Sequence, residues 1–452
     1  GFLMGVVVPL SLAAVAPAQT EELVPPPTPV TVHSVGGPMP GGPMPSVSEL
    51  AHEVNPGLPP ESEVVGLPQM EPGHKPDESH KVPPLPCVFA EADWIYWWLS
   101  SARVPVPLVA FLPPGNQPEA PGILGGNPAG FDVFSGARLR VGGWFDPEGD
   151  WGVEGSGFLL ARQQRTLGAL SDSGGNPSLV RPFLDASDLQ TVLVPVSVPG
   201  VLVGTLTATA ALNYEGAEAN VVAGLVRQGW RLDALAGYRF LDLRESLNIL
   251  QQGQVLPGAV LDGGPLGPLG GGTSFLIGDR FHTTNEFNGC QVGLRAQCFY
   301  QAVDLQLVGK IGVGDNRQEV QAVGATFVTP TPGGLAAAGG QAGFTSANGL
   351  LVQPSNAGTF GRDRASLISE IALIGGAQVT PHVRLTVGYS ALYWGGVVRP
   401  GDQIDPVINS SQVPLNPAFR PGAVQGPARP ATLFRTSDLW AQGLVLGVEL
   451  SY

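Results

Sequence analysis

The sequence predicts an all-β protein: a transmembrane up-and-down antiparallel β-barrel of about ten strands, with long outer loops and short periplasmic turns. Three observations support this prediction. Apolar and polar residues alternate with a period of two in ten stretches, and the gaps between these stretches are alternately long and short. In addition, charged residues and glycines share one face of the stretches, while aromatic residues share the other.

Composition excludes several other classes of protein. Charged residues make up 13% of the 452 residues, about half of the roughly 25% found in soluble proteins. The 63 glycines and 45 prolines argue against a helical protein and for many turns. The net charge of −14 argues against a nucleic-acid partner. Beyond the N-terminal segment no apolar run reaches the length of about 18 residues that a membrane-spanning helix needs.

The N-terminal part predicts export and a tether. Residues 1–18 have the pattern of a secretory signal peptide, an apolar run that ends in the small-residue sequence Ala16-Pro17-Ala18. Residues 19–86 are rich in proline, contain the repeat GGPMPGGPMP and carry nine carboxylates against two lysines. We therefore expect a disordered, acidic periplasmic tether there. Residues 87–452 form the predicted barrel domain.

Gap lengths order the predicted strands. The alternating stretches are 89–100, 135–146, 151–163, 203–216, 226–243, 286–298, 302–314, 365–379, 383–394 and 438–452. The long gaps are 101–134, 164–202, 244–285, 315–364 and 395–437, and the short ones lie at 146–150, 217–220, 299–301 and 380–382. In outer-membrane barrels short turns face the periplasm, so both ends of the barrel domain are expected on that side.

Aromatic side chains recur near strand ends on the apolar face. These predicted girdle residues are Trp94, Tyr96, Trp98, Trp230, Tyr238, Phe240, Tyr389, Tyr393, Trp440 and Tyr452. Trp440 and Tyr452 are twelve residues apart, a spacing that suits two interfacial girdles on either side of an apolar band about 25 Å tall. For each of these aromatic residues taken singly, the alternative to a girdle position is a position in the core of a soluble barrel.

Charges on the opposite face predict a polar lumen. The predicted lumen-lining residues are Glu91, Asp93, Arg138, Arg140, Glu154, Arg162, Glu215, Arg231, Asp233, Arg239, Arg295, Asp304, Lys310, Glu370, Arg384 and Glu449. Eight are acidic and eight are basic. A Lys or Arg on the lipid face near the midplane costs about 2–4 kcal/mol, so a membrane barrel must turn these side chains inward.

The last strand predicts both closure and a partner. From Trp440 to Tyr452, apolar side chains alternate with Gly443, Gly447 and Glu449. We expect this strand to pair with the first one, because an open sheet edge does not persist in lipid. A C-terminal aromatic strand is also a signal of the kind that the outer-membrane barrel assembly machinery reads, so that machinery is an expected partner.

Candidate sites for chemistry are few. Cys87, Cys290 and Cys298 have no metal-ligand spacing, and the last two are too far apart along one predicted strand to form a disulfide. The best catalytic constellation is Asp279, His282 and Glu286, but no second histidine lies nearby. We therefore expect no enzymatic activity, no metal and no cofactor.

A salt bridge is also expected at the base of the last long loop. Arg399 and Asp402 are three residues apart in the run VVRPGDQID. An exposed pair of this kind contributes at most about 1 kcal/mol.

Several stretches resemble a known family. They are EADWIYWWLSSARVPVPLV, SGARLRVGGWFDPEGDWGVEGSGFLL, YRFLDLRESL, VRLTVGYSALYWGGVVRPGDQID and SDLWAQGLVLGVELSY. Together they resemble the planctomycete β-barrel porins that form the seventh of the putative porin families, over residues 89–452. The resemblance implies a barrel in the outer membrane of a Gram-negative-type envelope. It brings no catalytic or binding motif with it.

Two functions follow from these expectations. In an eight-stranded barrel, side chains just fill the interior. A ten-stranded barrel is wider than this and far narrower than the sixteen-stranded porins. The first function is therefore porin-like passage of small solutes or ions through a narrow, partly plugged lumen. The alternative is a rigid membrane anchor that presents five long surface loops for binding, adhesion or envelope structure. Neither the solute nor the oligomeric state follows from the sequence.

Overall fold

The computed structural model describes residues 87–100, 102–104, 106–112, 122–125, 128–262, 265–330, 343–420 and 426–452. Of the two units into which the chain divides, Gly1–Pro72 and Gly73–Tyr452, the second contains all of these residues. The predicted signal peptide (1–18) and tether (19–86) lie outside the described residues. Within the described ranges, no helix is long and apolar enough to cross a membrane.

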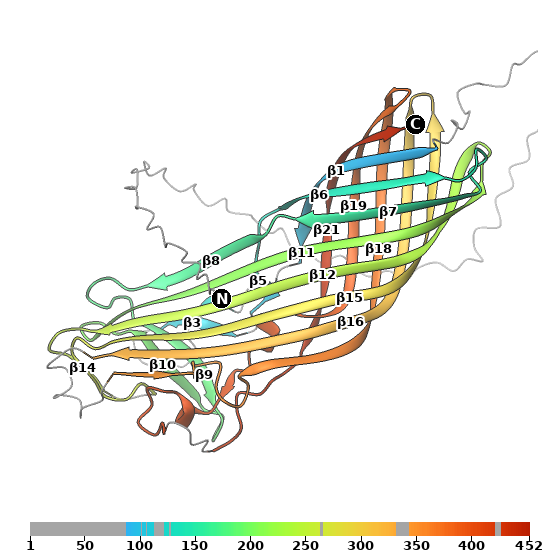
Figure 1. Cartoon of the computed structure of the whole chain (residues 1–452). Coiled ribbons are helices and arrows are strands. Elements are labelled where there is room, and N and C mark those ends of the chain that lie inside the picture. Colours follow the sequence, from blue (N-terminus) through green and yellow to red (C-terminus); the bar gives the residue numbers. More distant parts are fainter. Residues whose placement is uncertain are drawn as a thin grey trace, which may run out of the picture. The chain divides into compact units, whose positions relative to one another are not determined.

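Ten antiparallel strands form a closed ring (Figure 1), which confirms the predicted fold class. In ring order they are β1 (Val88–Leu99), β6 (Phe134–Trp144), β7 (Trp151–Leu160), β11 (Leu202–Val226), β12 (Trp230–Val255), β15 (Ser274–Tyr300), β16 (Val303–Thr329), β18 (Gly358–Thr380), β19 (Val383–Val398) and β21 (Thr436–Ser451). The last strand, β21, pairs with β1 from Phe89↔Ser451 to Leu99↔Ala441. This pairing removes the open edge that lipid would not tolerate.

Four strands are much longer than the sequence pattern predicts. Strands β11, β12, β15 and β16 contain 25, 26, 27 and 27 residues, and Figure 1 shows them running far beyond the shorter strands. Residues 244–255, 274–285 and 315–329 were expected in loops and are strand. The predicted turn at 217–220 is also wrong, because these residues lie within β11 and the chain turns at 227–229.

The phase of the apolar pattern reverses along these long strands, which explains the error. In the half of β12 that begins at the short turn, the apolar residues Ala236 and Tyr238 point outward and Arg239 points inward. Farther along, Leu247 and Ile249 are buried inside and the polar residues face out. A strand whose apolar face changes sides loses its period-two signal at the change.

The outer ends of the long strands enclose a second, smaller sheet. It consists of β10 (Thr191–Ser197), β9 (Leu179–Asp185), β3 (Pro107–Phe111), β4 (Gly122–Gly125) and β20 (Val407–Ile408). Strand β8 (Gln163–Leu170) extends the barrel wall beside β11. Buried residues of the small sheet, such as Val109 and Val194, share one apolar core with Leu206 and Ile277 of the long strands. We call this packed unit the head.

Short elements complete the described part of the chain. They are β2 (Ala102–Arg103), β5 (Pro128–Ala129), β13 (Val260–Leu261), β14 (Leu269–Gly270), β17 (Phe344–Ser346) and the 3₁₀ turns η2 (Gly401–Gln403) and η3 (Ser410–Gln412).

Closure of the barrel depends on a close approach of β1 and β21. A Cβ atom at Gly443 would lie 1.9 Å from the carbonyl oxygen of Tyr96 on β1. We predict that Gly443→Ala pushes the two strands apart and costs at least about 1–3 kcal/mol, the usual penalty for overpacking. The measurement is the fraction of refolded protein that shows heat-modifiable mobility on unboiled gels.

Gly309→Ala is the matched control, because a Cβ atom at Gly309 on β16 would meet nothing within 4 Å. It should fold like the wild type. Equal folded fractions for the two variants would contradict the proposed role of the Gly443 contact.

Candidate functional site: the barrel lumen

The two faces of the barrel wall differ sharply in chemistry. On β1, Trp94, Tyr96 and Trp98 are 55%, 40% and 45% exposed, whereas Glu91 and Asp93 are 3% and 5% exposed. All ten side chains of the predicted girdles point to the outside of the ring. Apolar side chains therefore cover the exterior, and ionised ones are enclosed.

A row of carboxylates marks the outer limit of the apolar band. On six strands, the first charged residue that points outward beyond the band is acidic: Glu215, Asp242, Glu286, Asp315, Asp363 and Asp438. On β12 the band runs from Trp230 to Phe240, about 33 Å along the strand at roughly 3.3 Å per residue. With the usual strand tilt of about 40°, this gives the apolar height of about 25 Å that a bilayer needs.

The structure places fourteen of the sixteen predicted lumen residues on the inner face. They are Glu91, Asp93, Arg138, Arg140, Glu154, Arg231, Asp233, Arg239, Arg295, Asp304, Lys310, Glu370, Arg384 and Glu449. The other two predictions are wrong. Glu215 points outward beside Asp242, and Arg162 is exposed because β7 ends at Leu160.

Sequence reasoning missed the central carboxylate of the lumen, Glu218. It forms ion pairs with Lys310 and with Arg239, the latter at 3.0 Å, and it accepts a hydrogen bond from Gln291 at 3.0 Å. Arg239 also pairs with Glu370 of β18, which is not a neighbour of β12 in the ring. The sequence did contain a signal. On a continuous strand, Glu218 lies on the same face as the inward residue opposite Glu154. The assignment of 217–220 to a turn concealed this alternation.

Further ion pairs extend this cluster, which we call the ion-pair layer. They join Arg138 to Asp93 at 2.7 Å, Arg140 to Glu91, and Arg295 to Glu154. Removing one member of such a buried pair leaves an uncompensated charge and typically costs about 3–5 kcal/mol. The layer consequently fixes the relative positions of the strands that carry it.

An apolar plug follows the ion-pair layer toward the head. Tyr214 and Trp394 are fully buried and stack with their ring centroids 6.2 Å apart. Phe287 lies 6.2 Å from Trp394, and Phe158 bridges Tyr214 to Trp97 at 5.2 and 5.4 Å. We call these five residues the aromatic layer. Strands β11 and β19 are far apart in the ring, so the Tyr214–Trp394 contact crosses the lumen.

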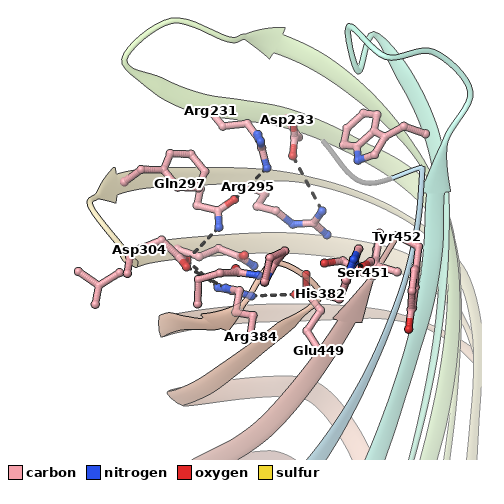
Figure 2. A pocket seen from close by; sticks show the side chains of 18 of the residues that line it. Arg231, Asp233, Arg295, Gln297, Asp304, His382, Arg384, Glu449, Ser451 and Tyr452 are labelled. Atoms are coloured by element: carbon pink, nitrogen blue, oxygen red, sulfur yellow. Dashed lines mark hydrogen bonds and ion pairs between the residues drawn. The ribbon is translucent and has the colours of Figure 1, made fainter. Parts of the chain in front are cut away.

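A cavity of about 540 Å³, the vestibule, opens at the short-turn end (Figure 2). Arg384 spans it, donating to Asp304 at 2.6 and 2.8 Å and to Glu449 at 2.8 Å. The ring of His382, in the β18–β19 turn, stacks on Tyr452 with centroids 4.8 Å apart. Deeper cavities within the ion-pair layer hold only about 30 and 20 Å³, room for about one water molecule each.

Comparison with known families decides the identity of this barrel. Residues 89–452 match the family described as "Putative beta barrel porin-7". The chain belongs to that family. It is therefore a porin-7 barrel of the outer membrane, as the resemblance in its sequence implied.

Solved structures show more distant likeness. The crystal structure of the outer membrane protease OmpT from Escherichia coli is 10% identical, with a TM-score of 0.37 over 83% of this chain and 100% of that one. An anion-selective porin from Comamonas acidovorans is 10% identical, with a TM-score of 0.19 over 82% of this chain and 100% of that one. No curated protein matches the porin-7 chain in sequence.

The catalytic constellation considered from the sequence is not assembled in the porin-7 barrel. Asp279 points inward, where it pairs with Arg181 at 3.3 Å and accepts hydrogen bonds from the backbone of Leu351 and Val352. His282 points outward on the same strand, away from Asp279. Burial lowers the pKa of Arg181 despite its acidic partner, so this pair is a structural contact of the head.

Other predicted contacts also differ. Arg399 pairs with Glu245 at 2.6 Å, not with Asp402, whose carboxylate accepts a hydrogen bond from Ser437. The three cysteines are exposed and unpaired, and the described residues contain no cluster of three side chains suited to a metal ion.

Two neighbouring glutamates allow a direct test of the lumen assignment. Glu218→Gln leaves Lys310 and Arg239 without their shared carboxylate, so we predict a loss of about 3–5 kcal/mol in the free energy of unfolding. Glu215→Gln is the matched control and should change stability by less than about 0.5 kcal/mol, as surface substitutions do. Urea unfolding in detergent micelles measures both. A larger effect at Glu215 would refute the placement of these residues.

Proposed function

We propose that the porin-7 barrel is a non-conducting outer-membrane platform that holds its head at the cell surface. The observation that carries this proposal is the aromatic layer, in which Tyr214, Phe287 and Trp394 meet across the lumen. In sixteen-stranded porins the interior is wide enough for water, whereas here side chains from opposite walls touch. Between the vestibule and this aromatic layer, the cavities within the ion-pair layer hold only about 30 and 20 Å³.

The head has the properties of a folded domain that is presented by a rigid base. Its apolar core combines the small sheet with the outer halves of four barrel strands. Buried ion pairs fasten it: Arg181 of β9 pairs with Asp279 of β15, and Arg399 pairs with Glu245 of β12. The described parts of the long loops are thus packed into the head, and they offer a surface suited to binding or envelope structure.

Two further assignments belong to this proposal. The outward aromatics form the girdles at both membrane interfaces, with Trp230 and Tyr452 at the periplasmic side and Trp98 and Trp440 at the outer side. The C-terminal strand β21 is the part that the barrel assembly machinery recognises. No catalytic role is assigned to the barrel.

Passage of small solutes is the second candidate function, and the vestibule is the observation that favours it. Transport would require movement of both the ion-pair layer and the aromatic layer. Each movement would break contacts between strands that are not neighbours in the ring, such as Arg239–Glu370 and Tyr214–Trp394.

Planar-bilayer recording separates the two candidates. We predict that the wild-type barrel shows no steady conductance, because the aromatic layer blocks ions. The triple variant Tyr214→Ala, Phe287→Ala and Trp394→Ala should show small conductance steps, since it removes the rings that meet across the lumen.

The matched control replaces Trp94, Tyr96 and Trp440 with alanine, three aromatic residues on the outer face. It should remain non-conducting. A large, steady conductance in the wild-type protein would overturn the platform proposal in favour of transport.

The head should loosen in acid. Burial by itself would raise the pKa of Asp185, but hydrogen bonds from Ser187 and Ser410 outweigh it and hold that pKa below its usual value. A depressed pKa contributes stability at higher pH that is lost as the pH falls through the folded-state value. We predict that protease cleavage of the head increases as the pH falls below about 4.

Ser410→Ala removes one donor and returns the pKa of Asp185 toward normal, so cleavage should begin at higher pH. Ser246→Ala, on the outer face of β12, is the control and should follow the wild-type profile. Identical pH profiles for Ser410→Ala and the wild type would argue against this contact as the cause.

A further inference from the structure

At its inner end the vestibule meets the ion-pair layer, whose cavities hold only about 30 and 20 Å³. Its wall comes from the short-turn ends of several strands, including Arg140 on β6 and Arg295 on β15. Both arginines are held from behind by carboxylates of the ion-pair layer, Glu91 and Glu154. A molecule that enters from the short-turn side therefore meets a wall of paired charges.

Each side-chain carboxylate that lines the pocket is paired with an arginine. Both oxygens of Asp304 accept hydrogen bonds from Arg384, and one of them accepts another from Gln297 at 2.9 Å. Glu449 is paired with Arg384. Asp233 is paired with Arg227 at 2.7 Å and lies 3.9 Å from Arg295. Figure 2 shows Asp233, Arg295, Gln297, Asp304, Arg384 and Glu449 around the cavity.

Two donors at this pocket have no hydrogen-bond acceptor in the described part of the chain, whereas the one buried carboxylate oxygen without a hydrogen bond, Asp233 Oδ1, is held by its ion pair with Arg227. Among the described residues, neither Gln306 Nε2 nor Arg295 Nε has a hydrogen-bond acceptor. Gln306 is 4% exposed and Arg295 is 8% exposed, and both line the cavity. A buried donor without an acceptor costs about 1–3 kcal/mol, so these two atoms favour an occupant that carries oxygen acceptors.

Aromatic rings hold the cationic wall in place. The guanidinium of Arg140 lies 5.5 Å from the centroid of Phe89, and that of Arg231 lies 5.0 Å from the centroid of Phe299. Both aromatic residues also line the cavity. Because these contacts restrain the two guanidinium groups, the wall of the pocket is preformed instead of consisting of mobile side chains.

We propose that the vestibule binds a small periplasmic oxyanion, a carboxylate or a phosphate, through Gln306 and Arg295. The pocket's carboxylates are neutralised by arginines, so they do not repel such a ligand, and the unpartnered donors supply its hydrogen bonds. The volume of about 540 Å³ lies within the range of small-molecule sites. This inference goes beyond the platform function and does not depend on what the head binds.

Isothermal titration of the full chain in detergent micelles tests the proposal. Succinate and inorganic phosphate are titrated separately at low salt. We expect saturable binding of at least one of them, and the tighter arm identifies the ligand as a carboxylate or a phosphate. Gln306→Leu should weaken the binding at least tenfold, because it removes an unpartnered donor without breaking any ion pair.

Gln252→Leu, on the outer face of β12 in the head, is the matched control and should bind like the wild type. Gln306→Glu is a second variant, which keeps the side-chain size and places a negative charge in the pocket; it should abolish binding. Absence of saturable binding for both anions, or equal affinity in Gln306→Leu and the wild type, would overturn the proposal. Neither result bears on conductance, so the platform function is tested separately.

Discussion

Hydrocarbon cannot solvate charge, and this constraint organises the porin-7 barrel. Strands that cross the bilayer must turn every ionised side chain inward, where the only available compensation is another ionised side chain. The lumen accordingly contains cations and anions in direct contact, with Glu218 shared by Lys310 and Arg239 at its centre. Some of these pairs, such as Glu218–Lys310 and Arg239–Glu370, join strands that are not neighbours in the ring, so charge compensation also fills the interior.

The same constraint explains the reversal of the wall at the membrane boundary. Where lipid ends, water replaces it on the outside, and the outward positions change from apolar residues to Asp242, Asp315 and Asp363. Inside, the ionised layer gives way to aromatic rings and then to the apolar core of the head. One continuous strand such as β15 therefore serves as a membrane strand in one half and as a strand of a water-soluble domain in the other.

Much of the membrane part could be predicted from the sequence. Alternation and loop lengths gave ten strands, closure of β21 on β1, and the inward face of fourteen charged residues, because the bilayer imposes one rule on every spanning strand. The head could not be predicted in this way. Its strands reverse their apolar phase, and partners such as Arg181 and Asp279 are 98 residues apart, so no local pattern connects them.

The errors at single residues have the same origin. Glu215 points outward, but it lies just beyond the lipid, where an outward carboxylate has no desolvation penalty. Glu218 was missed because the asparagine at position 220, two residues further on, is of a type common in turns. The boundary of the bilayer, which the sequence does not mark, decides between these assignments.

Trp97 and Trp98 provide the most direct test of the inside-out arrangement. They are adjacent in sequence, yet Trp97 is 2% exposed and donates a hydrogen bond to Ser390, whereas Trp98 is 45% exposed on the outer face. The measurement is fluorescence quenching by brominated lipids in two single-tryptophan variants, one that retains Trp97 and one that retains Trp98. We predict strong quenching of Trp98 and weak quenching of Trp97. Strong quenching of Trp97 with protection of Trp98 would contradict the inside-out arrangement.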